Sequence, residues 1–105
     1  MVDCLFCKVL RGEFGTKFVY DDEFCKVFYD IHPKAHTHLL IVPLQHIPSV
    51  LDSDKKDSEL LGHLILVSKK VSEDLGLSGY TLKINVGKDG GQEIFHIHIH
   101  LMSKS

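Results

Sequence analysis

Three histidines alternate with apolar residues near the C-terminus, in the run His96-Ile97-His98-Ile99-His100. Residues two apart in a β-strand point to the same face, so the three imidazoles would share one face and the isoleucines the other. A neutral imidazole can act as a nucleophile, and a charged one can stabilise phosphate oxygens or donate a proton. The row therefore indicates phosphate chemistry. A metal site built on His-x-His is one alternative, and an ordinary half-buried strand with histidine at its outer positions is the other.

A glycine-rich loop leads into this row. Residues 87–91 read Gly-Lys-Asp-Gly-Gly. Glycine permits positive φ and lets backbone N–H groups come close to an anion. Alone, such a loop more often only turns the chain, but directly before three histidines it favours anion binding.

A second candidate cluster is the Cys4-x-x-Cys7 pair. Two thiolates one helical turn apart suit half of a tetrahedral zinc site, although a redox pair or two buried thiols would look the same. His46, just after an expected strand, is the natural third ligand. Cys25 is expected in the core. An odd total of three cysteines, with no secretion signal at residues 1–4, predicts reduced thiols and a cytoplasmic protein.

The elements that would position these residues follow from periodicity. Helices are expected over 4–11 and 53–75, and strands over 17–21, 25–30, 37–43, 80–86 and 93–102. The longer helix carries one apolar stripe, made of Leu60, Leu61, Leu64, Ile65, Val67, Val71 and Leu75. Strands, a long helix and more strands predict a single α+β domain over 1–105, with an antiparallel sheet of about five strands and two helices.

Composition limits the partners. The chain has 105 residues and a formal net charge of -2, with acidic and basic residues mixed. It lacks the basic stripe that a nucleic-acid partner requires. No apolar stretch is long enough to cross a membrane.

Longer segments carry a family resemblance. The run from Asn85 to Leu101 resembles the histidine triad (HIT) signature His-φ-His-φ-His-φ-φ, in which φ is apolar. The segment from Asp30 to Pro43 is similar to the family's nucleoside-binding and fourth-histidine segment, and residues 4–9 look like its opening helix. Within the family the chain is most similar to the nucleoside phosphoramidases. A purine nucleotide is thus the expected small-molecule partner.

The resemblance implies a role for each catalytic histidine. His98 is expected to attack the α-phosphorus of a nucleoside 5′-phosphoramidate, or of an aminoacyl-adenylate, giving a nucleotidyl-histidine that water hydrolyses to the nucleoside monophosphate. His100 is expected to contact the phosphate and transfer a proton. His38 would complete the cluster from a neighbouring strand, and His96 is the first member of the triad.

The nucleoside pocket implied by the resemblance draws on six residues. Asp30 would accept hydrogen bonds from ribose hydroxyls, and Phe6 and Ile31 would sandwich the base unless they are core residues. Asn85, Gly91 and Glu93 complete the set, and Glu93 stands where some relatives have a serine that assists the leaving group. His32, His36 and His63 are expected to be surface or structural.

The family further implies a structural zinc and a homodimer. His96 would be the fourth zinc ligand, beside Cys4, Cys7 and His46, and no cofactor is needed for catalysis. The sheets of two copies would join into one layer, with the long helix supplying part of the interface. Alternative functions are dinucleoside polyphosphate hydrolysis, nucleotide binding without catalysis and, less favoured, a catalytic metal centre.

Overall fold

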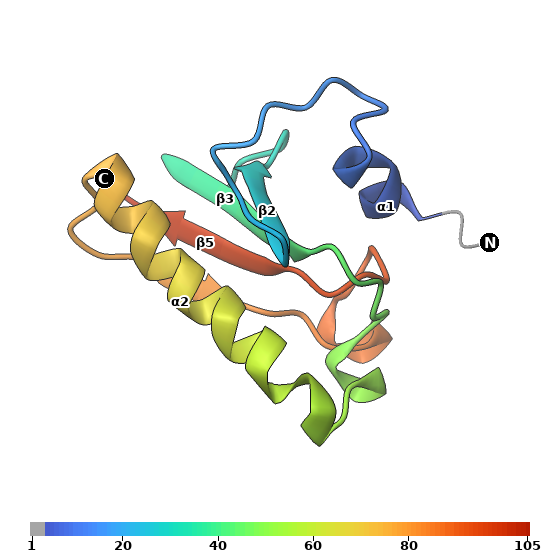
Figure 1. The fold of residues 1–105 in the computed structure, drawn as a ribbon. Helices are drawn as coiled ribbons and strands as arrows, with labels where there is room; N and C mark the ends of the chain where they lie inside the picture. Colours follow the sequence, from blue (N-terminus) through green and yellow to red (C-terminus); the bar gives the residue numbers. More distant parts are fainter. Residues whose placement is uncertain (1–3) are drawn as a thin grey trace.

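Residues 4–105 are described in a computed structural model of the chain. The helices are α1 (Leu5–Leu10) and α2 (Ser58–Leu75), with 3-10 turns at Val50–Asp52, Lys55–Asp57 and Lys88–Gly90. The strands are β1 (Tyr20–Asp21), β2 (Cys25–Tyr29), β3 (Thr37–Pro43), β4 (Thr81–Lys83) and β5 (Ile99–Ser103). They form one antiparallel sheet in the order β1-β2-β3-β5-β4 (Figure 1). The predicted α+β class, with five strands and two helices, is confirmed. Residues 1–3, on which the expected lack of a secretion signal partly rests, lie outside the description.

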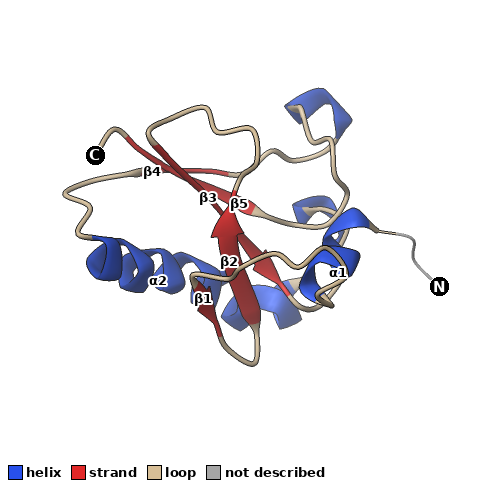
Figure 2. Cartoon of the chain, turned by 90° about the horizontal axis from the view of Figure 1, so that it is seen from above, coloured by secondary structure: helices blue, strands red, loops and turns tan. Residues whose placement is uncertain are grey.

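The sheet is covered on both faces because its central strand is apolar from Leu39 onwards. In β3, Leu39 and Ile41 pack into a core shared with Leu64 and Val71 of α2. Leu40 and Val42 point the other way, into a smaller core shared with Phe6, Val9 and Leu10 of α1. The period of two along β3 thus separates two cores, and the helices that cover them lie on different sides of the sheet (Figure 2).

The helix α2 is shorter, and its buried stripe narrower, than the sequence predicts. It begins at Ser58, after a capping box between Asp54 and Asp57, and ends at Gly76 in the left-handed conformation. Ile65 and Leu75 are 51% and 39% exposed, so their expected burial is wrong. The buried line of the helix runs through Leu64, Val67 and Val71, and Ile65 and Leu75 lie outside it.

Four strands are also shorter than predicted. The strand 25–30 ends one residue earlier, at Tyr29, 17–21 keeps only Tyr20–Asp21, 80–86 keeps Thr81–Lys83, and 93–102 becomes Ile99–Ser103. In the last case the chain before β5 leaves the regular ladder. The N–H of Ile97 bonds the carbonyl of Ile47, in the segment beyond β3. His96 and His98 therefore precede β5, although the alternation of their side chains persists.

Neither helix in the described part of the chain is both long and apolar enough to cross a membrane.

Candidate functional site

The alternating histidines lie on the α1 side of the sheet. Ile97, Ile99 and Leu101 pack into the α2 core, and the imidazoles face the opposite way. This face is covered: His96 is 0% and His98 8% exposed. The Phe6 ring of α1 stands edge-on to His98, with centroids 4.9 Å apart. The helix α1 therefore shields the histidines from bulk water.

The hydrogen bonds of His98 determine which ring nitrogen is reactive. Its Nδ1 lies 2.8 Å from the carbonyl oxygen of His96. A carbonyl only accepts, so Nδ1 carries the hydrogen and Nε2 keeps its lone pair. Burial lowers the pKa of His98, outweighing the His96 carbonyl and the charge of Asp30, which raise it. The neutral ring with a free Nε2 is the nucleophilic form of histidine.

His38 and His100 form a pair beside His98. His38 Nε2 lies 2.9 Å from His100 Nδ1 and 3.5 Å from Asp30 Oδ2. The rings of His98 and His100 have centroids 5.0 Å apart. Burial lowers the pKa of His100 to about 4, helped by His98, His38 and Lys83, while burial also lowers the pKa of His38. Three imidazoles with lowered pKa values are thus brought together: His38 from β3, His100 from β5 and His98 from the chain that enters β5.

The glycine loop is tied to the segment after β3 by a residue that sequence reasoning missed. Gln92 is 6% exposed, and its Oε1 accepts from the N–H of Gly87 at 2.9 Å. Its Nε2 donates to the carbonyls of Pro48, at 2.7 Å, and Ile94, at 3.1 Å. Gly87 and Gly91 have φ of 73° and 82°, which explains the glycines. Nothing in the spacing reveals Gln92, because a glutamine after a glycine loop is ordinarily a surface residue.

The predicted nucleoside-binding residues do not all lie in one environment. Ile31 is 86% exposed and open to a ligand, whereas Phe6 is buried in the α1 core, with only its edge towards His98. Asp30 Oδ1 accepts from the His32 N–H at 2.8 Å, and its other oxygen faces His38. Asn85 donates to the carbonyl of Gly90 at 2.8 Å and braces the glycine loop.

The remaining two loop residues differ in their surroundings. A side chain added at Gly91 would meet Asn85 Nδ2 at 3.4 Å. Glu93 is exposed and lines a hollow of about 420 Å³ together with Cys4 and His46. Glu93 therefore borders the cysteine cluster.

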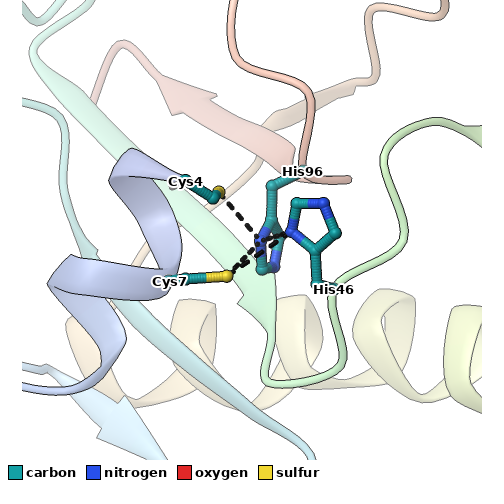
Figure 3. Close-up of side chains that lie close together, drawn as sticks. All are labelled: Cys4, Cys7, His46 and His96. Atoms are coloured by element: carbon teal, nitrogen blue, oxygen red, sulfur yellow. Dashed lines mark hydrogen bonds between the residues drawn. The ribbon is translucent and has the colours of Figure 1, made fainter. Parts of the chain in front are cut away.

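Cys4, Cys7, His46 and His96 converge between α1, the segment after β3 and the chain entering β5 (Figure 3). Their ligand atoms all lie within 4.8 Å of one another. The Nδ1 of His96 is 3.5 Å from Cys4 Sγ, 3.7 Å from Cys7 Sγ and 3.1 Å from His46 Nδ1. His46 Nδ1 is 3.4 Å from Cys7 Sγ.

This donor set fits zinc. Ligands at 2.0–2.3 Å from a tetrahedral ion would be roughly 3.3–3.8 Å apart, close to these separations. His96 Nε2 lies 2.8 Å from the carbonyl of Pro43 and donates to it, which leaves the Nδ1 lone pair facing the cluster. Four protein ligands fill a tetrahedral shell, so the site suits a structural ion.

The other histidines are structural or exposed, as the sequence predicts. His63 of α2 lies 2.7 Å from Asp22 Oδ2, and Asp22 Oδ1 accepts the N–H groups of Phe24 and Cys25. This cluster ties the β1–β2 turn to α2. Cys25 is 0% exposed, in the core as expected. His32 and His36 are exposed.

Comparison with known proteins shows that the chain is similar to HIT-domain proteins over nearly its whole length. The family model of the HIT domain matches residues 11–105. A HIT-like protein from Synechococcus elongatus is 41% identical over 101 residues, covering 95% of this chain and 89% of that protein. The purine nucleoside phosphoramidase of Escherichia coli K12 is 40% identical over 102 residues, covering 95% of this chain and 86% of the enzyme.

Solved structures agree. A HIT family hydrolase from Legionella pneumophila superposes with a TM-score of 0.93 at 45% identity, covering 98% of this chain and 94% of that chain. A histidine triad protein from Clostridium difficile also gives a TM-score of 0.93, at 36% identity, covering 97% of this chain and 90% of that one.

Proposed function

Because the chain belongs to the HIT family of nucleotide hydrolases, we propose that it cleaves the P–N bond of purine nucleoside 5′-phosphoramidates. Aminoacyl-adenylates are a second substrate of the same chemistry, since they also present a leaving group on the α-phosphorus. The observation that carries the proposal is the bond from His98 Nδ1 to the His96 carbonyl, which leaves Nε2 unprotonated in a buried, neutral ring. The purine preference rests on the name of the Escherichia coli relative.

The reaction has two steps. His98 Nε2 forms a bond to the α-phosphorus as the P–N bond breaks, and the amine leaves with its nitrogen protonated. Water then attacks the phosphorus of the nucleotidyl-histidine, the P–Nε2 bond breaks, and the nucleoside monophosphate is released. Splitting one displacement into two is the advantage of a covalent intermediate.

The surrounding groups bind the substrate. His100 contacts a phosphate oxygen. Of the glycine loop, the N–H groups of Gly87, Gly90 and Gly91 are bonded within the protein, so those of Lys88 and Asp89 are the ones proposed to meet the anion. The exposed Ile31 packs on the base, and Asp30, beside it, accepts hydrogen bonds from the ribose. Phe6 limits the pocket on the α1 side and holds the His98 ring in place.

Zinc, held by Cys4, Cys7, His46 and His96, would act as a structural clamp. It joins α1 to the chain that carries His98, since His96 lies two residues before the nucleophile. A chain of this size gains stability from such a cross-link. When bound, zinc supplies this cross-link and leaves no ligand position for substrate.

A homodimer is the second structural proposal. The strand β4 lies at one edge of the sheet, where another strand can pair. On α2, Ile65 and Leu66 are 51% and 68% exposed. Pairing of two such edges would continue the sheet and cover these side chains. That the protein is cytoplasmic is also a proposal, and it rests on the odd number of cysteines, which favours reduced thiols.

The test compares the natural protein with His98→Ala on adenosine 5′-phosphoramidate, with His36→Ala, an exposed histidine, as the matched control. We expect AMP release by the natural protein and by His36→Ala, and none by His98→Ala. Brief incubation followed by mass spectrometry should detect the nucleotidyl adduct on His98. Faster turnover of a dinucleoside polyphosphate would instead favour P–O–P cleavage. AMP binding without turnover of either substrate would refute the enzyme proposal.

A further inference from the structure

The His38–His100 pair has a third member that no motif marks, the main chain of Lys34. The Lys34 N–H donates to His38 Nδ1 at 3.0 Å. On the other side of the same ring, Nε2 lies 2.9 Å from His100 Nδ1. His38 is 2% exposed, so water cannot substitute for either partner. A main-chain donor, a buried ring and a second ring therefore form one chain of hydrogen bonds.

The positions of the protons in this chain follow from the donor at its end. An amide N–H only donates, so His38 Nδ1 must accept and cannot hold a hydrogen. The one hydrogen of the neutral His38 ring is then on Nε2, and it points to His100 Nδ1. That atom must accept in turn, which leaves the hydrogen of His100 on Nε2, at the end of the ring away from His38.

We propose that the Lys34 amide is a positioning group that, through His38, holds His100 as a neutral Nε2–H hydrogen-bond donor to the substrate phosphate. His38 is then a positioning residue that acts through His100. The inference rests on the proposed function, because it assigns a role within that site.

The same chain of hydrogen bonds prevents His38 or His100 from taking up an additional proton and becoming charged. A charged His38 would direct an Nδ1–H at the N–H of Lys34, and a charged His100 would direct an Nδ1–H at the Nε2–H of His38. The carboxylate of Asp30 favours a positive charge on the pair, and the side chains of Lys34 and Lys83 oppose it. A neutral imidazole is a hydrogen-bond donor but a very weak acid. The leaving amine therefore takes its proton from water or from its own ammonium form. The resemblance implies two roles for His100, phosphate contact and proton transfer, and only the phosphate contact remains.

The first test uses the unmodified protein without substrate, so its outcome does not depend on the proposed function. In ¹⁵N spectra of uniformly labelled protein at pH 7, His38 and His100 should both show Nε2 protonated and Nδ1 bare. Scalar coupling across the hydrogen bonds should link the Lys34 nitrogen to His38 Nδ1. An Nδ1–H tautomer or an imidazolium at either residue would overturn the inference.

The second test removes the donor. Lys34→Pro lacks the N–H, whereas Lys34→Ala keeps it and isolates the effect of the side chain. We expect mixed tautomers at His38 in Lys34→Pro only. Its kcat/KM on the phosphoramidate should be about 10-fold lower than that of Lys34→Ala, the lower end of the effect of removing a group that orients a functional side chain. Unchanged circular dichroism would confirm that Lys34→Pro folds. A folded Lys34→Pro with natural tautomers, or with the kcat/KM of Lys34→Ala, would refute the proposal.

Discussion

Replacing Gln92 by alanine tests whether one buried amide organises the glycine loop. The side chain makes three hydrogen bonds to main-chain groups of Gly87, Pro48 and Ile94. These join the loop, the segment after β3 and the chain entering the histidine row. Among residues 4–105, no other side chain forms hydrogen bonds to all three segments.

The magnitude follows from these bonds. Each net hydrogen bond is worth about 1 kcal/mol, and a buried group left without a partner costs as much or more. Gln92→Ala should therefore lose about 3 kcal/mol of the free energy of unfolding, with each bond counted at about 1 kcal/mol. For a domain of this size that lowers Tm by roughly 10–20 °C. Below the new Tm, kcat/KM should also fall, because Gln92 also holds Ile94, in the chain that leads to His96 and His98.

The assay is urea unfolding followed by circular dichroism, with thermal scans alongside. Gln45→Ala is the matched control, since Gln45 is exposed, and its effect should stay within about 0.5 kcal/mol. Gln92→Glu keeps an acceptor for Gly87 but sets a carboxylate oxygen against two carbonyls, so it should be no more stable than Gln92→Ala. A loss below about 1 kcal/mol in Gln92→Ala would show that water satisfies the freed groups and would refute the reasoning.

Three further predictions use other parts of the molecule. The N–H groups of Phe24 and Cys25, with His63 and Tyr20, overcome the opposing effect of burial and lower the pKa of Asp22. The stability this provides is complete above the carboxyl's ordinary pKa of about 4 and is lost as pH falls below it. Acid titration of unfolding should therefore be steeper for the natural protein than for Asp22→Asn, and parallel curves would contradict the assignment. Elemental analysis should find one zinc per chain in the natural protein and none in Cys7→Ser, whose Tm should be lower; equal zinc in both would exclude the site. Leu66→Asp should shift sedimentation from dimer to monomer, and a monomer in both proteins would remove the proposed interface.

Local patterns were sufficient for much of the fold. The run 37–43 is observed as a strand with the predicted bounds, because a mostly apolar run of seven residues has the length of a buried strand and is too short for a typical helix. The alternation of histidine and apolar residues predicted which side chains share a face, since that depends only on the period of an extended chain. It holds even before β5, where the regular ladder is lost.

The burial of individual helix residues and the exact start of β5 could be known only from the tertiary structure. Whether Ile65 and Leu75 are buried depends on how wide a surface the sheet presents to α2, which helical periodicity does not contain. The chain leaves the ladder before β5 because Ile97 bonds Ile47, a partner distant in sequence.

The chemistry divides in the same way. The sequence by itself determined the residue types and, with the family resemblance, predicted four zinc ligands, which the structure brings together, and the proposed nucleophile. Only the tertiary structure decided which ring nitrogen carries the hydrogen in His96, His98 and His38. The deciding partners are the carbonyl of Pro43, the carbonyl of His96 and the N–H of Lys34, respectively. Main-chain donors and acceptors are identical in every residue, so sequence cannot distinguish them, and folding alone places a particular one against a ring.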